Sequence, residues 1–281
     1  MKQGQPSTTA QRVALGRAAH QVIDHPKVFD DPIAARIVGA EALADIAAVR
    51  RQENGRLQRY MRAAVVARSR FAEEELASAV QRGVRQCVIL GAGMDTFAYR
   101  NPHPQLHVFE VDHPATQAGK REQLGRAGTD LPHGLRFVPV DLETQALGQA
   151  LQLAGFDADA PAFFSWLGVT MYLEPSTVLA TLKTISRGPG GNQVVFDYVI
   201  PLAQHSFARR IAYRVLLARL AAIGEPWKSF FDPASLQREL TGLGFSHLED
   251  LGQQAINARY FAGRTDGLAV GPGGHLMSAR T

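Results

Sequence analysis

Two closely spaced glycines follow an apolar run, and an acidic pair follows them about twenty residues later. The run Cys87–Leu90 leads directly into Gly91-Ala92-Gly93. This pattern predicts a buried parallel strand that ends in a tight turn, where glycine lets a ligand approach the backbone. A second strand-like run ends in Glu110 and Asp112, at a distance that suits a carboxylate binding ribose hydroxyls. These features indicate a cofactor that contains a nucleoside, and they leave open which one.

The residues after the turn bear on the identity of that cofactor. A dinucleotide fingerprint has glycines spaced G-x-G-x-x-G, but Thr96 occupies the third position here. Asp95 precedes it, and an acid at a helix N-terminus would repel a pyrophosphate. A cofactor with a cationic part and no phosphate fits better, and S-adenosylmethionine is such a molecule. A nicotinamide-dependent oxidoreductase and a purely structural turn remain the alternatives.

A third strand-like run, LRFVPV, ends in Asp141-Leu142. An acid beside an apolar residue at a strand exit can accept a hydrogen bond from an adenine amino group while the apolar side chain covers the ring. A single aspartate at this place is more often a helix cap. Three successive strands that each end in a ligand group are more specific than any one of them.

These residues need a parallel sheet to bring them together. Strand-like runs alternate with helix-like runs from residue 85 onward, which predicts an α/β sheet with helices on both faces. The strand-like runs are QCVIL, QLHVFEV, LRFVPV, AFFSWL and NQVVFDYVI, and the helix-like runs are Ala115–Ala127, Gln145–Ala154 and Ser176–Ser186. Residues 1–84 read as a helical cover, with helical segments at Asp31–Arg50 and Leu57–Val80.

The last part of the chain departs from this alternation. Residues 202–243 predict a helical insertion within the core of residues 85–281, and its first helix, up to Ile223, is a candidate lid. FSHLEDL (245–251) and INARYFAG (256–263) predict two closing strands arranged as a hairpin, and HLMSA (275–279) a short terminal strand.

The composition excludes several classes of protein. The 281 residues carry a formal charge of +4 with no run of five basic residues, which argues against nucleic-acid binding. No apolar run reaches about 18 residues and the N-terminus is polar, so we expect a cytoplasmic protein with no membrane partner. Cys87 is the only cysteine, which rules out an intrachain disulfide. Prolines around His103 and His107 argue against a helical zinc site, and we expect no metal.

Several motifs along the chain resemble the leucine carboxyl methyltransferase family and its bacterial relatives, which include polyketide O-methyltransferases. The motifs are STTA (7–10), FDDP (29–32), RSRF (68–71), LGAGMDTFAYR (90–100), VFEVDHPATQ (108–117), VPVDLE (138–143), LGVTMYL (167–173) and RYFAGRTDGL (259–268). They occur in the family's order and span nearly the whole chain. The resemblance implies a Rossmann-like, doubly wound sheet of seven strands, mostly parallel with an antiparallel last strand.

The resemblance also implies an S-adenosyl-L-methionine-dependent methyltransferase and assigns roles to matching residues. Arg68 would bind the methionine carboxylate, a task that suits a bidentate guanidinium, and Arg17 would assist. The turn Gly91-Ala92-Gly93 would pass the cofactor. Asp112 would hold the ribose hydroxyls, and Asp141-Leu142 would bind the adenine.

The acceptor side follows the family less closely. Leu167 stands where many members have an acid that would meet the cationic end of the cofactor, so a small-molecule acceptor is a safer expectation than a protein carboxylate. Methyl transfer depends mainly on positioning, and the expected acceptor is a carboxylate or hydroxyl oxygen. Candidates for lining its pocket, each with a core or surface role as the alternative, are Trp166, Tyr172, Tyr260 and Arg264.

The sequence gives weaker indications of a function for a few other side chains. His113 and His205 are candidate bases for a phenolic acceptor, although a lone histidine is usually structural. Arg209 and Arg210 could attract an acidic substrate or simply face water. A fold relative that has lost catalysis and acts through protein contacts is a further alternative, against which the set Gly91, Asp112 and Asp141 argues.

Overall fold

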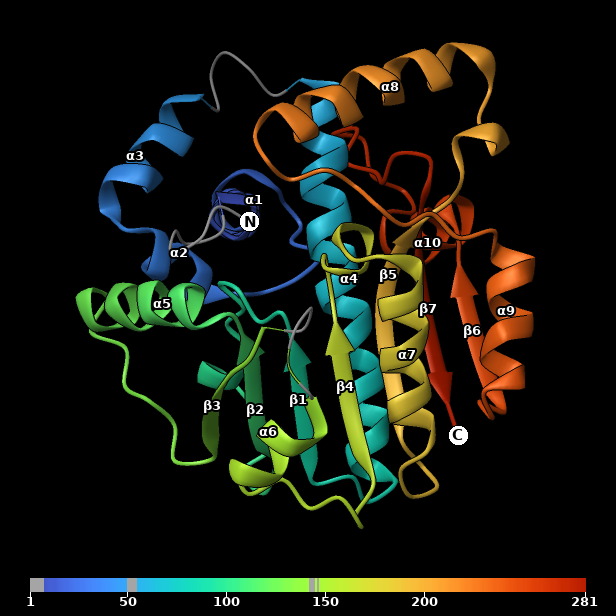
Figure 1. Cartoon of the computed structure of the whole chain (residues 1–281). Coiled ribbons are helices and arrows are strands. Elements are labelled where there is room, and N and C mark those ends of the chain that lie inside the picture. The colour runs from blue at the N-terminus through green and yellow to red at the C-terminus, as the bar shows by residue number, and fades with distance from the viewer. Residues whose placement is uncertain (1–7, 50–54, 142–144, 146) are drawn as a thin grey trace.

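A seven-stranded sheet lies at the centre of the computed structural model, which describes residues 8–49, 55–141, 145 and 147–281 (Figure 1). The strand order is β3-β2-β1-β4-β5-β7-β6. The strands are β1 (Gln86–Leu90), β2 (His107–Asp112), β3 (Leu135–Pro139), β4 (Ala162–Trp166), β5 (Gln193–Val199), β6 (His247–Leu251) and β7 (Gly274–Arg280). Only β7 runs antiparallel to its neighbours in this sheet. The predicted mostly parallel sheet with an antiparallel last strand is therefore confirmed.

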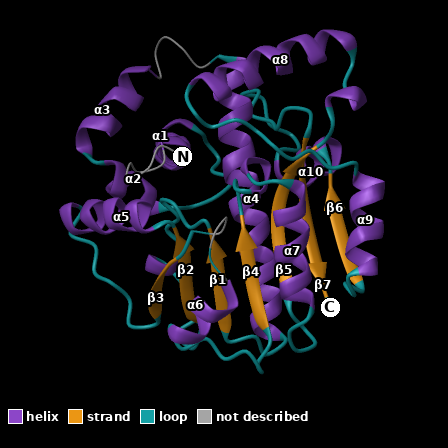
Figure 2. Ribbon diagram, viewed as in Figure 1, coloured by secondary structure: helices purple, strands orange, loops and turns teal. Residues whose placement is uncertain are grey.

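Helices cover both faces of the sheet (Figure 2). One face packs against α4 (Arg56–Gln81) and α10 (Gln253–Tyr260). The other packs against α6 (Leu147–Leu153), α7 (Pro175–Ser186) and α9 (Pro233–Gly242). Alternate strand residues supply the two cores, since Cys87 and Ile89 face α4 while Val88 and Leu90 face the opposite layer. The remaining crossover helix, α5 (Pro114–Arg126), contacts β3.

Three N-terminal helices lie beyond the carboxyl edge of the sheet (Figure 1). They are α1 (Thr8–Ile23), α2 (Pro32–Val38) and α3 (Ala40–Val49). The predicted segment Asp31–Arg50 is interrupted at Gly39, whose φ of 87° ends α2. Asp31 caps α2 as its sequence predicts, because its Oδ1 accepts from Ala34 N at 3.0 Å. The division of the chain at residue 84 stays a prediction.

The C-terminal segments differ from the prediction at residues 256–263. INARYFAG does not form a strand, because most of it belongs to helix α10. Ile256 and Tyr260 are four residues apart and both buried, which is the spacing of one helix face. The antiparallel partner of β6 is instead β7, which contains the HLMSA run. The predicted insertion forms a short 3-10 helix at Leu202–Gln204, then α8 (Phe207–Ala222) and α9.

No helix among the described residues is both long and apolar enough to cross a membrane. Cys87 is buried in β1, where burial raises the pKa of its thiol. A buried, protonated thiol is a packing residue, as expected for a small side chain in the sheet.

Candidate active site

A cavity of about 450 Å³ opens at the carboxyl ends of β1, β2 and β4. The chain leaves β1 toward β2 and β3, while β4 lies on its other side, so the cavity sits where the strand order reverses. Ligands of open α/β sheets bind at this kind of place. Among the predicted cofactor residues, those that line the cavity are Arg68, Gly91, Ala92, Gly93, Asp112 and Asp141. Leu142 lies outside the described residues.

The glycine turn forms the floor of the cavity. Gly91 and Gly93 have φ values of 64° and 48°, which favour glycine over any other residue. A Cβ on Gly91 would collide with the side chain of Val169, and a Cβ on Gly93 would lie 3.1 Å from that of Ala10. The turn is therefore in close contact with the loop after β4 and with α1, and larger residues would disrupt both contacts.

Asp112 fastens the end of β2 to this turn. Its carboxylate accepts from Gly93 N, and its Oδ1 accepts from His113 N at 2.6 Å. Burial raises the pKa of Asp112, although the two backbone donors oppose the change. The carboxylate is thus held at the strand end, on the cavity side, by groups that come from two neighbouring strand exits.

Arg68 reaches the cavity from α4 and lies against Gly168. A Cβ on Gly168, whose φ is 73°, would be 2.6 Å from Nη2 of Arg68, so only glycine leaves room for the guanidinium. Asp197 on β5 orients this pair, because its Oδ2 lies 2.9 Å from Arg68 Nη1 and its Oδ1 accepts from Gly168 N. We did not predict a role for Asp197, although an acid inside the apolar run NQVVFDYVI was a usable signal.

Arg17 and Asp95 bring further charge to the cavity. Arg17 lines it from α1 while remaining almost fully buried, with Nε 3.2 Å from Asp31 and a hydrogen bond to Met94 O. Asp95 also lines it, and its Oδ1 accepts from Phe97 N at 2.8 Å. Only a 3-10 turn, Phe97–Tyr99, follows Asp95, and its N-cap residue is Thr96.

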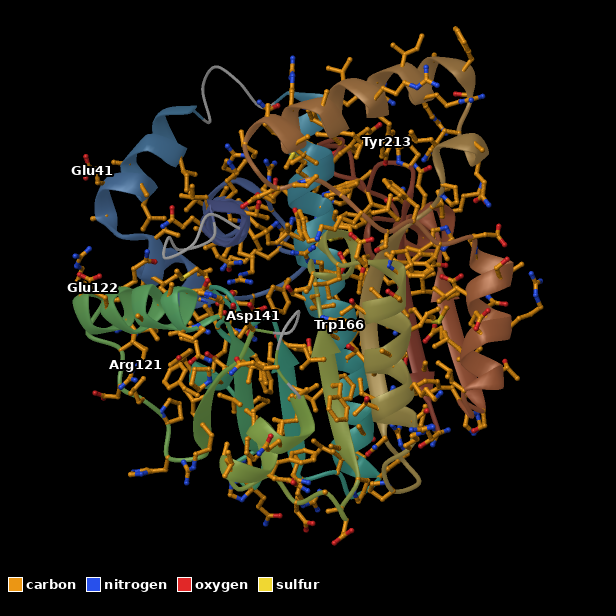
Figure 3. The ribbon with its side chains drawn as sticks, viewed as in Figure 1. Glu41, Arg121, Glu122, Asp141, Trp166 and Tyr213 are labelled. Atoms are coloured by element: carbon orange, nitrogen blue, oxygen red, sulfur yellow. The ribbon has the colours of Figure 1, made fainter. Side chains whose placement is uncertain are left out.

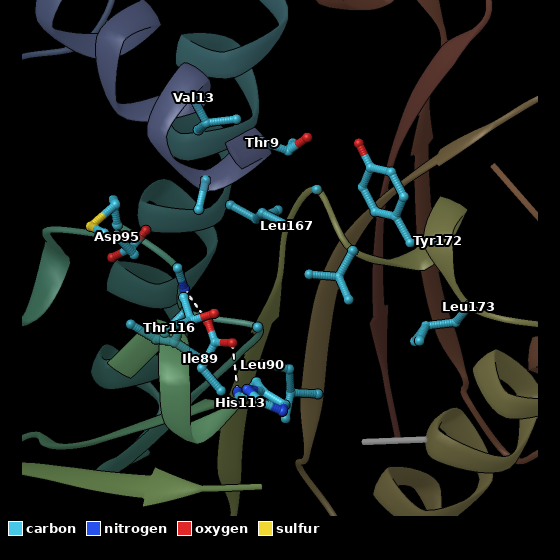
Figure 4. A pocket seen from close by; sticks show the side chains of 18 of the residues that line it. Thr9, Val13, Ile89, Leu90, Asp95, His113, Thr116, Leu167, Tyr172 and Leu173 are labelled. Atoms are coloured by element: carbon cyan, nitrogen blue, oxygen red, sulfur yellow. Dashed lines mark hydrogen bonds between the residues drawn. The ribbon is translucent and has the colours of Figure 1, made fainter. Parts of the chain in front are cut away.

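A second wall faces the glycine turn and comes from distant parts of the chain (Figure 4). Tyr172 contributes to it, and its hydroxyl points toward Thr9 of α1. Thr9 N donates to Glu225 Oε1 at 3.2 Å, and the Thr9 hydroxyl also binds Glu225. Lys228 lines the same wall, 3.7 Å from Glu174. Thr9 belongs to the STTA motif, but we predicted no site role for it, and we missed Gly224, Glu225, Pro226 and Lys228, which belong to no recognised pattern.

Three of the four predicted acceptor contacts lie elsewhere. Trp166 is buried within the sheet (Figure 3), because Ser165 takes the cavity side and the next residue of a strand points to the opposite face. Tyr260 lies on α10, where its hydroxyl donates to Glu74 at 2.8 Å. Arg264 binds Asp266 and Pro26 O. Only Tyr172 of this group lines the cavity.

The two candidate bases also differ in position. His113 lines the cavity, but its Nδ1 accepts from Ala115 N at 3.2 Å and so caps α5. His205 is not a lining residue and stacks on Tyr213 with ring centroids 4.6 Å apart. Burial and the nearby charge of Arg209 lower the pKa of His205. In the described part of the chain, no group of three or more His, Cys, Asp or Glu is placed to hold a metal ion.

Glu110 does not accompany Asp112 into the cavity. It is fully buried beneath the strand end, with its Oε2 2.6 Å from Lys120 Nζ. Burial raises the pKa of Glu110 to about 7, although the ammonium of Lys120 opposes the change. The folded protein therefore binds a proton here more tightly than the unfolded chain, and the contribution of Glu110 to stability falls as pH rises from about 4.5 to about 7.

We expect Lys120→Met to destabilise the protein in a pH-dependent way. Without the ammonium, ionised Glu110 has no charged partner, so the loss should be about 3 kcal/mol at pH 8. At pH 5.5 the protonated carboxyl needs no such partner, and the loss should be less than about half as large. Urea unfolding at the two pH values measures the difference, with the exposed Lys183→Met as control. Equal losses at both pH values would contradict the assignment.

Comparison with known proteins adds to this geometry. The model of the family described as leucine carboxyl methyltransferase matches residues 10–186. "Putative S-adenosyl-L-methionine-dependent methyltransferase YktD" of Bacillus subtilis (strain 168) is 33% identical over 297 residues, covering 96% of each chain. A similarly named protein of Mycobacterium sp. (strain JLS) is 32% identical over 270 residues, covering 91% of this chain and 80% of its own.

Solved structures share the fold. A DUF574 family protein from Streptomyces avermitilis superposes with a TM-score of 0.55 at 17% identity, covering 95% of this chain and 96% of its own. At this level of identity the likeness concerns the fold alone.

Proposed function

Because the chain belongs to the leucine carboxyl methyltransferase family, we propose that it transfers a methyl group from S-adenosylmethionine to an oxygen atom of a small molecule. Dependence on S-adenosylmethionine follows from the family and its relatives. The observation that best supports the proposed site is Asp112, whose carboxylate is fixed at the end of β2 beside the glycine turn.

The cavity residues suit the parts of this cofactor. A carboxylate such as that of Asp112 can accept from both ribose hydroxyls, and Asp141 at the next strand exit can accept from the adenine amino group. Gly91 and Gly93 line the cavity with backbone atoms alone, which a cofactor can pass at close range. Arg68 can bind the methionine carboxylate, since its guanidinium is held against Gly168 by Asp197 and faces the cavity.

The acid that would meet the ammonium group of the cofactor is not at position 167 and has to come from elsewhere in the sequence. Leu167 occupies the family's acidic position and lines the cavity as an apolar residue. Asp95 lines the cavity from the turn after β1 and keeps a partly exposed carboxylate there. We assign Asp95 to the ammonium group, because opposite charges at a partly buried site attract more strongly than in bulk water.

The bound cofactor supplies an electrophilic methyl group on its sulfonium. The protein has to hold the acceptor oxygen in line with that methyl and to exclude water. Leu167, Val169 and Tyr172 form the apolar part of the wall where an acceptor would lie. A carboxylate acceptor is already ionised near pH 7 and needs no base, whereas a hydroxyl would need one. An acceptor of either kind satisfies the proposal.

Thermal unfolding in the presence of candidate ligands tests the cofactor. At about 100 times its Kd, S-adenosylhomocysteine should stabilise the protein by about 2.7 kcal/mol and raise the Tm by several degrees, with NAD giving no shift. A shift with NAD alone would indicate an oxidoreductase. No shift with S-adenosylmethionine, S-adenosylhomocysteine or NAD would favour a relative that has lost catalysis.

A mass-spectrometric screen tests the acceptor. The protein is incubated with S-adenosylmethionine and a panel of small carboxylic acids, phenols and amines. We expect an acid or a phenol to gain the mass of one methylene group, and the product should be an ester or an ether. A methylated amine as the sole product would contradict transfer to oxygen.

A further inference from the structure

Helix α8 carries apolar side chains on the side that faces solvent. It lies along the edge of the molecule beyond the carboxyl ends of the strands (Figure 1), and none of its residues is buried. Phe207, Ile211 and Val215 are 78%, 49% and 48% exposed. They follow one another at intervals of four residues and therefore share one face. We call these three residues the apolar stripe of α8.

The opposite side of α8 is already in contact with the rest of the protein. Tyr213 lies on that side (Figure 3), stacks on His205, and donates from its hydroxyl to Pro272 O. Leu216, Leu217 and Leu220 are half-buried. The helix is thus apolar on two sides, and only one of them is covered. A helix with this pattern is typical of an element that contacts two partners.

The charge on α8 is entirely positive. Its arginines are Arg209, Arg210, Arg214 and Arg219. The sequence contains no Asp or Glu between Asp197 and Glu225. Within the part of the chain that the structure describes, no ion pair joins any of these guanidinium groups to a carboxylate. At about 3.6 residues per turn, exposed Arg214 and Arg219 fall on either side of the apolar stripe.

We propose that α8 docks the protein on an anionic lipid surface. An amphipathic helix binds such a surface by placing its apolar side at the boundary of headgroups and acyl chains while its arginines contact lipid phosphates. The aliphatic parts of Arg214 and Arg219 can lie along that boundary with their charged ends in the headgroup layer. This is contact with the surface, and it requires no membrane-spanning segment.

Charge argues against a second copy as the partner. A two-fold contact places the same surface on both subunits, so a dimer formed through the apolar stripe would bring two sets of arginines together. Like charges across an interface are unfavourable, and α8 offers no acid to offset them. An anionic partner matches both the apolar stripe and its flanking charge.

The docked helix would also place the cavity close to lipid. α8 ends at Ala222, and Gly224, Glu225 and Pro226 directly after it line the cavity. Docking does not depend on methyl transfer, so it can be measured whether or not the proposed function holds.

Cosedimentation with lipid vesicles tests the proposal on the full-length chain. We expect binding to vesicles of phosphatidylglycerol and phosphatidylcholine, and at least tenfold weaker binding to phosphatidylcholine alone. The double variant Phe207→Ser/Ile211→Ser should bind the mixed vesicles about tenfold or more weakly, because two apolar contacts are lost. Arg214→Glu and Arg219→Glu should each reduce binding by roughly fivefold or more. Leu153→Ser, at an 84% exposed position on α6, is the matched control and should bind normally.

Three outcomes would overturn this assignment. The first is no binding to the anionic vesicles. The second is binding that the double variant leaves unchanged, which would mean that the apolar stripe takes no part. The third is a dimer in analytical ultracentrifugation that dissociates in the double variant, which would show that a second copy covers α8. Unchanged circular dichroism and an unchanged thermal shift with S-adenosylhomocysteine verify that the variants are folded.

Discussion

Asp112→Ala should weaken the binding of S-adenosylhomocysteine by about a hundredfold or more. If Asp112 holds the ribose as we propose, the variant loses two charge-assisted hydrogen bonds to it, each with an expected contribution of about 1.5–3 kcal/mol. It also releases Gly93 N and His113 N, which the carboxylate holds in the free protein. The loss should therefore exceed that of a contact made only to the ligand. Isothermal titration calorimetry measures the affinity.

A matched exposed aspartate separates this effect from a general change of charge. Asp130→Ala, at an exposed position after α5, should leave the affinity unchanged. Asp112→Asn keeps the shape of the side chain and should give an intermediate loss, since an amide retains one acceptor oxygen. An Asp112→Ala variant that binds with normal affinity would show that the ribose assignment is wrong.

Arg62→Leu should cost about 3–5 kcal/mol of unfolding free energy. Nε and Nη2 of Arg62 bind the two carboxylate oxygens of Asp24 at 2.6 and 2.9 Å, and both side chains are buried. Burial alone would raise the pKa of Asp24, but hydrogen bonds from His20 and Arg62 lower it. Leucine would leave this buried carboxylate without its main partner. The site joins the segment after α1 to α4, so its loss should also loosen the N-terminal helices.

Chemical denaturation measures this loss, and an exposed pair provides the control. Arg126 and Glu122 form an ion pair in which both side chains are more than half exposed. Arg126→Leu should change stability by no more than about 0.5 kcal/mol, because surface pairs contribute little. Similar losses for Arg62→Leu and Arg126→Leu would contradict the role of burial.

Local patterns were sufficient to predict strands β1 to β5 and the residues at their carboxyl ends. Apolar runs that end in glycine or an acid can form few structures other than buried parallel strands. Gly91, Asp112 and Asp141 therefore lie together at one edge, as predicted. The prediction of a strand at INARYFAG was wrong, because aromatic and branched residues suit a strand as well as one face of a short helix.

Contacts between distant segments had no comparable local signal. Asp197 and Arg68 are 129 residues apart, and Thr9 and Glu225 are 216 residues apart. Trp166 was a candidate for lining the acceptor pocket, with a core position as the alternative, and its strand position turns it into the core. Ser165 is the residue that reaches the cavity. To choose between Ser165 and Trp166, one must know which face of the sheet each residue of the strand points to. An apolar run such as AFFSWL does not indicate this.

The hydrogen bonds between Thr9 and Glu225 have a consequence for the order in which the site forms. A chain that has left the ribosome only as far as residue 223 already contains every predicted cofactor residue. It lacks residues 224–228, and α1 has no partner on that side. The wall that contains Thr9 and Glu225 is therefore completed only after residue 225 has been synthesised and has met the first helix, later than the residues at the strand ends.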